Sequence, residues 1–309
     1  MILQFQPVYQ TRVWGGRELE TTFRRDLPNT DQPFGESWEI SAREEADSEV
    51  ISDGPFQGKR LTELWAENRT EIFGKLAPNS KRFPLLCKIL DARQRLSIQV
   101  HPPAEIASEL GGEPKSETWF IADAEPGAEI YVGIREGVSR SDFETALRDG
   151  TVEDCVHRIP VSPGQHIFIP SGRLHAIGAG IVIYEIQQNS DTTFRVFDWN
   201  RVGLDGKPRD LHIEESLRCI DFSDIGPGMD SADRTLLCEC DYFRMERHSI
   251  SPESPLSTVT AGRFSIVTII SGELGAFGKG DFFLVAAGSD SVEELSGNAN
   301  ILATTWPTG

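Results

Sequence analysis

The segment from Gly164 to His175 constrains the fold most, because it has the pattern of a β-hairpin that places one histidine. A glycine precedes the short apolar run Ile167–Ile169, a Pro-Ser-Gly turn follows, and a second strand begins at the histidine. Similar turn signals recur along the whole chain, which contains 28 glycines and 18 prolines between short apolar runs. This punctuation predicts a mainly β architecture.

The same hairpin pattern occurs a second time near the C-terminus. Gly280–Gly288 repeats the order of a glycine, five residues, a small residue, one residue and a glycine. The proline position is now Ala286, and the histidine position is Ser291. Since Phe222–Asp233 has the Gly-, Asp- and Ser-rich composition of a linker, we expect a second β domain after it that lacks the histidine.

Short apolar runs between the turn signals predict the strands. We expect them at Trp38–Ser41, Leu85–Leu90, Leu96–Val100, Glu117–Ala122, Glu129–Val132, His166–Ile169, Ile181–Gln187, Phe194–Asp198 and Phe264–Ile270, with a turn at residues 271–273. Helical spacing of apolar residues and helix start and stop signals are fewer. They predict helical segments near 61–74, 103–111 and 139–150 and a fourth short helix near Ile213–Ile220.

The charge and the cysteines limit the kinds of partner and compartment. The chain has 48 acidic and 30 basic residues, a formal net charge of −18, which argues against nucleic acid or an anionic membrane as a partner. No apolar run approaches the length of a membrane span, and the N-terminus lacks a signal-peptide pattern. Five cysteines without C-x-x-C spacing favour a reducing compartment. We expect a cytoplasmic protein that is a monomer or a weak homodimer.

Four residues with metal-ligand chemistry fall on or beside predicted strands: Gln99, His101, Glu117 and His175. Because side chains alternate along a strand, Ser97, Gln99 and His101 share one polar face. Each residue alone also fits an exposed strand, a surface ion pair or a hydrogen-bonded core histidine. Together, one amide, two imidazoles and one carboxylate form a set of N and O ligands that suits zinc, and two histidines with a carboxylate also suit iron(II).

A further segment, Tyr184–Arg201, places charged residues within half-apolar strands. Arg195 lies between apolar neighbours, where a guanidinium suits an anionic ligand or a developing negative charge. An ion pair between Arg195 and Asp198 or Asp191 is the structural alternative.

These motifs resemble the class I mannose-6-phosphate isomerases (phosphomannose isomerases) of the cupin superfamily, especially the short bacterial form. The matching pieces run in the family's order from residue 13 to about residue 212, which is roughly two-thirds of the chain. They are Val13-Trp-Gly-Gly, Gly35-Glu-Ser-Trp-Glu-Ile-Ser, Phe83-Pro-Leu-Leu-Cys-Lys-Ile-Leu, Leu96-Ser-Ile-Gln-Val-His-Pro, Lys115-Ser-Glu-Thr-Trp, Pro170-Ser-Gly-Arg-Leu-His-Ala and Gln187-Gln-Asn-Ser-Asp-Thr-Thr-Phe-Arg-Val-Phe-Asp. The C-terminal third matches only as a generic cupin barrel.

The resemblance implies two cupin-type (jelly-roll) β-barrels with a small helical insertion. It implies a catalytic cupin domain over residues 1–221 and a degenerate cupin-like domain without a metal site over residues 222–309. It also implies one zinc ion per chain. Residue by residue, the family pattern makes Gln99, His101, Glu117 and His175 the metal ligands; Arg195, Lys115 and Glu185 the catalytic residues; and Lys88, Ser97 and Arg201 the substrate contacts.

The activity that the resemblance implies is the interconversion of mannose 6-phosphate and fructose 6-phosphate through a cis-enediol, in mannose metabolism. Glu185, Lys115 and a metal-bound water are alternative general bases for the proton transfer. Two other functions remain open at the level of sequence. An iron-dependent cupin oxygenase would have an apolar pocket, and a non-catalytic sugar-binding cupin would tolerate loss of the metal ligands.

Overall fold

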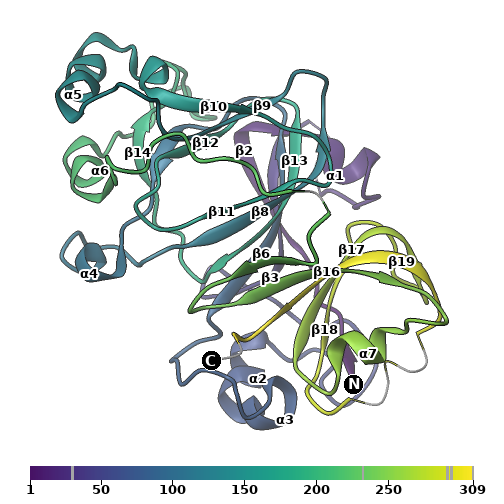
Figure 1. Ribbon diagram of the computed structural model, residues 1–309. Coiled ribbons are helices and arrows are strands. Elements are labelled where there is room, and N and C mark those ends of the chain that lie inside the picture. Colours follow the sequence, from purple (N-terminus) through teal and green to yellow (C-terminus); the bar gives the residue numbers. More distant parts are fainter. Residues whose placement is uncertain (29–30, 232, 290–291, 293–294, 308–309) are drawn as a thin grey trace.

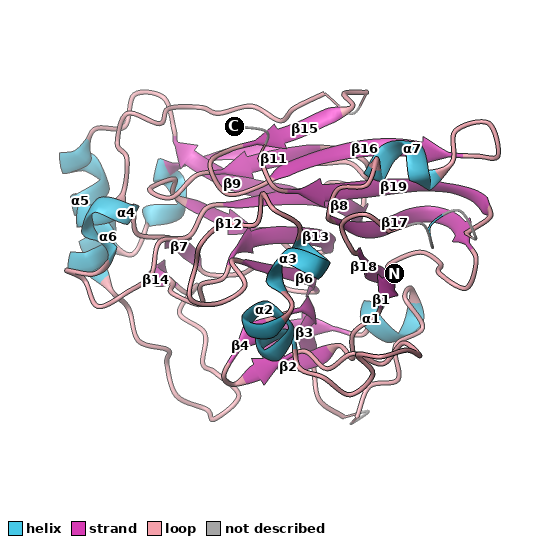
Figure 2. Cartoon of the chain, turned by 90° about the horizontal axis from the view of Figure 1, so that it is seen from below, coloured by secondary structure: helices cyan, strands magenta, loops and turns pink. Residues whose placement is uncertain are grey.

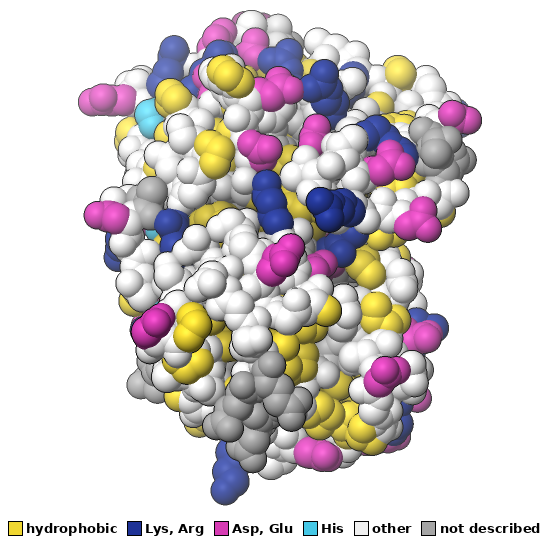
Figure 3. All heavy atoms as spheres, turned by 90° about the vertical axis from the view of Figure 1, so that its right-hand side faces the viewer, with side chains coloured by type: hydrophobic (Ala, Val, Ile, Leu, Met, Phe, Trp, Pro, Cys, Tyr) yellow, Lys and Arg dark blue, Asp and Glu magenta, His cyan; other side chains and the backbone are white. Residues whose placement is uncertain are grey.

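The computed structural model describes residues 1–28, 31–231, 233–289, 292 and 295–307. Three larger sheets and a pair of short strands, β4 (Ala42–Arg43) and β5 (Ala46–Asp47), contain most of the regular structure (Figure 1). This confirms the predicted mainly β fold. Ser291, the position expected to lack the histidine, lies outside the described residues. On the face drawn in Figure 3, acidic and basic side chains are interspersed, so the negative net charge is not gathered there into a single patch.

Two of the sheets face each other and form a sandwich around a shared apolar core. Side chains from both sheets meet in this core, among them Trp119, Ile130 and Ile183. The described strands pair as open sheets, so the expected barrel takes the form of a sandwich. In order, the five-stranded sheet contains β10 (Val156–Pro160), β9 (Glu129–Ile134), β12 (His175–Ile177), β7 (Ile98–Val100) and β14 (Phe194–Phe197). The six-stranded sheet contains β11 (His166–Ile169), β8 (Glu117–Ala124), β13 (Ile181–Gln188), β6 (Leu85–Ala92), β3 (Phe34–Ile40) and β2 (Val8–Gly16).

The third sheet is built mostly from the C-terminal part of the chain. Its strands are, in order, β1 (Ile2–Leu3), β18 (Phe282–Val285), β17 (Ser265–Leu274), β19 (Gly297–Thr305), β16 (Arg244–Ile250) and β15 (Leu236–Glu239). The repeated segment Gly280–Gly288 contains β18, which pairs with β17 and β1. The hairpin predicted for Gly164–His175 is wrong, because β11 pairs with β8 in one sheet whereas β12 pairs with β7 and β9 in the other. This segment connects the two sheets of the sandwich. Since β1 pairs with β18, the C-terminal sheet also takes in Ile2 and Leu3 from the start of the chain. The division at residue 221 stays a prediction.

The turn expected at residues 271–273 is wrong. Strand β17 continues through these residues to Leu274 and remains paired with β19. A shift in register between Ile269 and Ser271 accommodates the irregular stretch, and Gly272 has a φ of +78°. The glycine that suggested a turn therefore lies inside a paired strand, where its close approach to the Asn298 carbonyl oxygen leaves no room for a side chain.

The helices lie outside the three larger sheets (Figure 2). Helix α5 begins where the Ser139 side chain accepts a hydrogen bond from the Asp142 amide, and it ends at Gly150 in the left-handed conformation. The helical segment expected near 61–74 is divided in two at Asn68, whose φ of −120° is not helical. The helices are α1 (Glu18–Thr21), α2 (Leu61–Glu67), α3 (Arg69–Phe73), α4 (Ala104–Ala107), α5 (Arg140–Asp149), α6 (Ile213–Cys219) and α7 (Leu256–Thr260), with a 3₁₀ turn at Val152–Cys155. Among the described residues, no helix is long and apolar enough to cross a membrane.

The inside of the sandwich changes from apolar to charged along its strands. On β8, Trp119 and Ile121 belong to the apolar core, whereas Glu117 on the same face does not. Ile183 and Glu185 show the same change along β13. The alternation of the strands therefore gathers buried polar side chains at one end of the sandwich, which is where the candidate site lies.

The close approach of Gly178 to a neighbouring strand provides a test of this packing. A Cβ at Gly178, immediately after β12, would overlap the backbone carbonyl oxygen of Glu129, whereas a Cβ at exposed Gly228 would meet no atom. We expect Gly178→Ala to lower the free energy of unfolding by about 1–3 kcal/mol and Gly228→Ala to change it by less than about 0.5 kcal/mol. Urea unfolding of both variants measures the difference, and equal values would contradict the packing described.

Candidate metal centre and adjoining pocket

Three buried side chains converge at the charged end of the sandwich. His101 lies just after β7, Glu117 begins β8 and His175 begins β12, and each is only 1% exposed. One ligand atom from each lies within 4.8 Å of the others. Nε2 of His101 lies 3.3 Å and Nε2 of His175 lies 3.6 Å from the Glu117 carboxylate. Within the described residues this is the one such group of His, Cys, Asp or Glu, and its members come from the two facing sheets of the sandwich.

The polar atoms of this group fit a bound cation. Nε2 of His101 and both carboxylate oxygens of Glu117 are buried without a hydrogen bond. Buried polar atoms are normally hydrogen-bonded, and leaving them unpaired is costly. A metal ion held by the three side chains would satisfy these atoms, since imidazole and carboxylate are ordinary ligands of a divalent metal.

Backbone carbonyls hold the two imidazoles in the protonation state that a metal requires. Nδ1 of His101 lies 2.9 Å from the Thr192 carbonyl oxygen, and Nδ1 of His175 lies 2.9 Å from the Arg173 carbonyl oxygen. A carbonyl can only accept, so each Nδ1 carries the proton and each Nε2 presents a lone pair toward Glu117. Burial, and then the charge of Lys115, lower the pKa of His101 to about 3, and burial lowers the pKa of His175.

Gln99 lies beside this group on β7, where it is paired with His175 of β12. Its Nε2 is 3.2 Å from Nε2 of His175, and its oxygen accepts a hydrogen bond from the Ser97 hydroxyl. The predicted shared face of Ser97 and Gln99 is thus confirmed. In this arrangement Gln99 donates to His175 with its amide nitrogen, so its role as an oxygen ligand stays a prediction.

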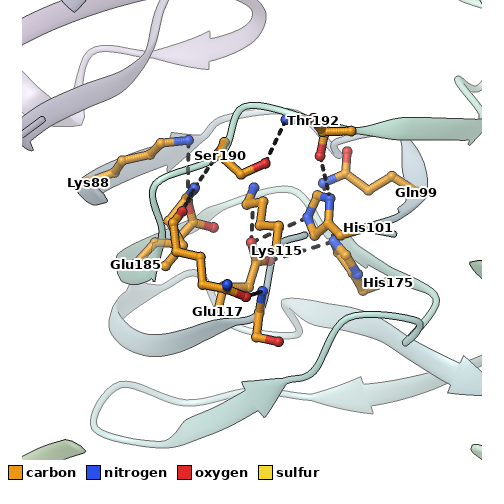
Figure 4. Close-up of polar contacts among 12 residues, drawn as sticks. Lys88, Gln99, His101, Lys115, Glu117, His175, Glu185, Ser190 and Thr192 are labelled. Carbon is orange, nitrogen blue, oxygen red and sulfur yellow. Dashed lines mark hydrogen bonds and ion pairs between the residues drawn. The ribbon is translucent and has the colours of Figure 1, made fainter. Parts of the chain in front are cut away.

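Lys115 connects the metal-ligand group to the remaining charged residues. Its Nζ lies 3.0 Å from Glu117, and Figure 4 shows it between the histidine pair and the pair formed by Glu185 and Lys88. Burial alone would raise the pKa of Glu117, but Lys115, with smaller effects of His101 and His175, holds that pKa well below its usual range. Glu117 is therefore a firmly charged carboxylate.

Lys88 lies between two buried glutamates that differ in their proton affinity. Its Nζ is 3.3 Å from Glu36 and 3.5 Å from Glu185. Burial opposes ionisation of Glu36, but Lys88 and Arg12 lower its pKa to about 2. Burial, and then the charge of Glu117, raise the pKa of Glu185 to about 7. Glu36 therefore stays ionised at neutral pH, whereas Glu185 takes up and releases a proton near neutral pH.

A pocket of about 390 Å³ opens beside these residues and contains most of the predicted substrate and catalytic positions. Lys88, Ser97, Lys115, Glu185 and Arg195 all line it, together with Gln99. Arg201 is not among the lining residues. The role of each predicted residue stays a prediction, but the structure brings all of them except Arg201 to the same pocket.

Several pocket residues were not predicted. They are Arg12, Trp14, Glu36, Trp119, Asp191, Thr193, Arg209 and His212. Glu36 could have been found, since it lies on the inward face of the Gly35–Ser41 motif two residues before Trp38, whose Nε1 donates to it at 2.7 Å. Arg209 follows Pro208 in a loop, where no periodicity marks which side chains face inward.

Comparison with known proteins places these features in a family context. Residues 2–119 match the family model for the phosphomannose isomerase type I catalytic domain. The mannose-6-phosphate isomerase ManA of Bacillus subtilis (strain 168) is 36% identical over 303 residues, with 93% of each chain covered. A crystal structure of the mannose 6-phosphate isomerase from Bacillus subtilis superposes with a TM-score of 0.82 at 30% identity, covering 98% of this chain and 99% of that one. A mannose 6-phosphate isomerase bound with zinc and yttrium shares the fold, with a TM-score of 0.68 at 16% identity over 99% of this chain and 99% of that one.

The unpaired atoms of the centre lead to a first prediction for metal content. We expect the purified protein to bind one divalent ion per chain and Glu117→Gln to lose that ion, because the substitution removes the anionic ligand. Glu125→Gln, which changes an exposed carboxylate paired with Arg93, is the matched control and is expected to keep the ion. Metal analysis after dialysis measures both, and full metal content in Glu117→Gln would contradict the assignment.

The lowered pKa of His101 predicts how stability without metal depends on pH. The folded protein keeps His101 neutral down to about pH 3, whereas the unfolded chain takes up the proton near the ordinary histidine pKa of about 6.5. Acid therefore favours the unfolded state, and the free energy of unfolding is expected to fall as pH decreases from about 6.5 toward 3. Urea unfolding of the chelated protein at several pH values measures this slope. His101→Gln is expected to flatten it, whereas His157→Gln, at a position outside the centre, should leave it unchanged; equal slopes in the wild type and His101→Gln would contradict the argument.

Proposed function

The chain belongs to the mannose-6-phosphate isomerase (phosphomannose isomerase) family, and on that premise we propose that it interconverts mannose 6-phosphate and fructose 6-phosphate. The observation that carries the proposal is the buried group of His101, Glu117 and His175, with unpaired ligand atoms, next to a pocket lined by both cations and a proton-exchanging carboxylate. Such a combination suits the transfer of a proton between two carbons of a negatively charged sugar.

Zinc is the metal that we propose for the centre. Two neutral imidazoles and a carboxylate make a three-ligand site of the kind that catalytic zinc uses, with a further position free for substrate oxygens. Gln99 is placed to complete the shell if its amide rotates, because its side chain already reaches His175. The chemistry that bound zinc supplies is Lewis-acid stabilisation of negative charge on the sugar carbonyl and hydroxyl oxygens.

We propose that Glu185 is the general base. The isomerisation removes a weakly acidic proton beside a carbonyl and returns it to the neighbouring carbon, so the base must both take up and release a proton near neutral pH. A pKa of about 7 meets this need, and Oε2 of Glu185 is buried without a hydrogen bond. Its other oxygen accepts from Nε1 of Trp119 at 3.1 Å, which fixes the orientation of the carboxylate.

Lys115 is less suited to be the base, because its ammonium is held at 3.0 Å from Glu117. We propose instead that Lys115 keeps Glu117 ionised and donates a hydrogen bond to a sugar oxygen from the floor of the pocket. Arg195 adds a fixed positive charge where negative charge develops, and Lys88 and Ser97 contact the sugar chain. Arg201 is paired with Asp198 and does not line the pocket, so its role as a substrate contact rests on the family pattern alone.

The charged pocket also bears on the two other functions that the sequence left open. An iron-dependent oxygenase calls for an apolar pocket, whereas Lys88, Lys115, Arg195 and Arg209 all line this one. A purely sugar-binding cupin has no need of a buried carboxylate with a pKa of about 7. Neither alternative uses the complete set of residues.

The proposed substrate is a small sugar phosphate, and we propose the cytoplasm as the compartment. The five cysteines are free thiols, as expected for a reducing environment. A monomer or weak homodimer, without nucleic acid or membrane as a partner, remains our proposal for its assembly.

A coupled assay with mannose 6-phosphate tests the proposed function. We expect a chelator to abolish turnover and zinc to restore it. Arg195→Ala is expected to lower kcat by about a hundredfold or more at unchanged zinc content, because it removes a fixed charge from the pocket without touching a metal ligand. Metal analysis beside the assay separates the two effects. Metal-replete wild-type protein without activity would refute the proposed function, and equal losses of zinc and turnover in Arg195→Ala would indicate a structural role for this arginine.

A further inference from the structure

Two cysteine side chains lie next to each other where β15 runs into β16. Cys238 lies on β15 and Cys240 follows the last residue of that strand, so both side chains point to the same face. Their sulfur atoms are joined by a hydrogen bond. The other three cysteines are buried on separate elements, Cys87 on β6, Cys155 in the 3₁₀ turn and Cys219 in α6. Neither Cys238 nor Cys240 lines the pocket described above, so this thiol pair is separate from the candidate metal centre.

The two thiols differ in exposure and in their contacts. Cys238 is 6% exposed and lies in an apolar core cluster, whereas Cys240 packs at the edge of that cluster and is partly exposed. Cys240 also begins the turn between the strands, because its backbone amide donates to the Phe243 carbonyl oxygen at 3.0 Å. Its Sγ lies 3.5 Å from the same carbonyl oxygen, and the amides of Tyr242 and Phe243 donate to the sulfur. The turn therefore surrounds the Cys240 sulfur with donors that stabilise a thiolate.

These contacts give the two thiols different reactivities. The hydrogen bond from Cys238, followed by those from the two turn amides, lowers the pKa of Cys240 to about 7, although burial opposes this effect. The same hydrogen bond, together with burial, raises the pKa of Cys238. A partly exposed thiolate is the form of cysteine that reacts with oxidants, and a neighbouring protonated thiol is placed to react with its product. Cys240 thus has the properties of the attacking sulfur, and Cys238 those of the second one.

A disulfide between these residues is within reach but would shorten the backbone. Residues along a strand rise about 3.3 Å each, so the Cα atoms of two residues separated by one lie about 6.6 Å apart. This is close to the upper end of the range of about 4.4–6.8 Å that disulfides span. Because β15 ends at Glu239, closure of the bond would draw Cys240 and the turn toward Cys238 while the paired part of the strand stays in place.

The turn that would move is connected to the metal centre by hydrogen bonds. Tyr242 lies in the turn, and its hydroxyl is hydrogen-bonded to the side chain of Gln188. The side-chain oxygen of Gln188 accepts from the Ser116 amide at 2.8 Å, and the Gln188 amide donates to the Ser116 carbonyl oxygen at 3.1 Å. Ser116 is the residue between Lys115 and Glu117. A displacement of Tyr242 therefore reaches the backbone that carries both of these charged residues.

We propose that Cys238 and Cys240 form a reversible disulfide in the presence of hydrogen peroxide, and that this bond slows the enzyme by displacing Tyr242 from Gln188. The formation of the disulfide is independent of the proposed function. The effect on turnover rests on that function, because it acts through Lys115 and Glu117.

The reaction balances with peroxide as the oxidant. The Cys240 thiolate attacks one oxygen of hydrogen peroxide, the O–O bond breaks and hydroxide leaves, so Cys240 becomes a sulfenic acid. The Cys238 sulfur then attacks the Cys240 sulfur, the S–O bond breaks, and the hydroxyl leaves as water with the proton of Cys238. In total, two thiols lose two electrons and two protons, and peroxide is reduced to two molecules of water. A low-molecular-weight thiol reverses the step by exchange with the disulfide.

Counting thiols tests the proposed bond without any measurement of turnover. We expect the full-length wild-type protein to lose two of its five thiols on treatment with a small excess of hydrogen peroxide at neutral pH, and to regain them with dithiothreitol. Thiol titration in denaturant counts them, and mass spectrometry of unreduced peptides locates the bond. An unchanged thiol count, or a bond between any other pair of cysteines or between two chains, would overturn the proposal.

Single substitutions separate the roles of the two sulfur atoms. In Cys238→Ala the reaction is expected to stop at a sulfenic acid on Cys240, which a cyclic 1,3-diketone traps. Cys240→Ser is expected to keep all of its remaining thiols, because Cys238 is buried and protonated. Cys219→Ala removes a buried thiol elsewhere and is the matched control, which should still lose two thiols. Loss of two thiols from Cys240→Ser would contradict the assignment.

Turnover and metal retention test the connection to the metal centre. Oxidised wild-type protein is expected to turn over mannose 6-phosphate about fivefold to a hundredfold more slowly than the reduced protein, because small displacements of catalytic groups are costly. A chelator is expected to remove its metal faster. Cys240→Ser should show neither change after the same treatment. Tyr242→Phe removes only the hydroxyl that contacts Gln188, so it should form the disulfide with a smaller loss of turnover.

The outcomes distinguish the parts of the proposal. Equal losses of turnover in oxidised wild type and oxidised Tyr242→Phe would overturn the path through Gln188, and an equal loss in Cys240→Ser would overturn the role of the thiol pair. If the reduced, metal-replete wild type has no isomerase activity, the proposed function fails. In that case the thiol count still decides whether the disulfide forms, and the rate of metal removal decides whether it reaches the metal centre.

Discussion

The ionised carboxylate of Glu117, buried inside a β-sandwich, is the constraint on which the rest of the site depends. A charge in such a place is expensive unless it is paired. Lys115 provides one partner at 3.0 Å, and the two neighbouring imidazoles are held neutral by backbone carbonyls, so they offer lone pairs and not positive charge. Lys115 balances the charge of Glu117, but Nε2 of His101 and Oε1 of Glu117 still have neither a hydrogen-bond donor nor a cation beside them among the described residues. A divalent ion held by the three side chains would satisfy these atoms.

Near Glu117, two buried glutamates differ in their pKa values because their surroundings differ. Glu36 and Glu185 flank the same lysine, yet their pKa values are about 2 and about 7. Glu36 also accepts from Trp38 and from Arg12, while Glu185 has one oxygen without a hydrogen bond and feels the negative charge of Glu117. Glu117 thus influences the chemistry at a distance: by staying charged, it keeps Glu185 ready to take up a proton.

The sequence could predict the parts of the site that depend on local regularity. Alternation along single strands predicted that Ser97 shares a face with Gln99, and family motifs pointed to the residues that the structure brings into one pocket. The stretch around Gly272 was mistaken for a turn, because a glycine can mark either a turn or a close approach inside a strand, and here it lies within β17. Arg209 could not be predicted, since its place depends on a loop being tied to β14 by contacts with His212, which no periodic pattern encodes.

The C-terminal sheet contributes to the site although no described metal-ligand group lies in it. The strand that carries Glu185 turns its other face outward, where Tyr184 and Ile186 pack in one apolar cluster with side chains of β17 and β18. Arg25 crosses the same boundary, with ion pairs to Glu39 on one side and Asp281 on the other. Because alternate residues of one strand face the pocket and this cluster, a shift of the C-terminal sheet would also move Glu185. The chemistry in the sandwich therefore depends on how the C-terminal sheet packs at this boundary. It does not need a second metal site in that sheet.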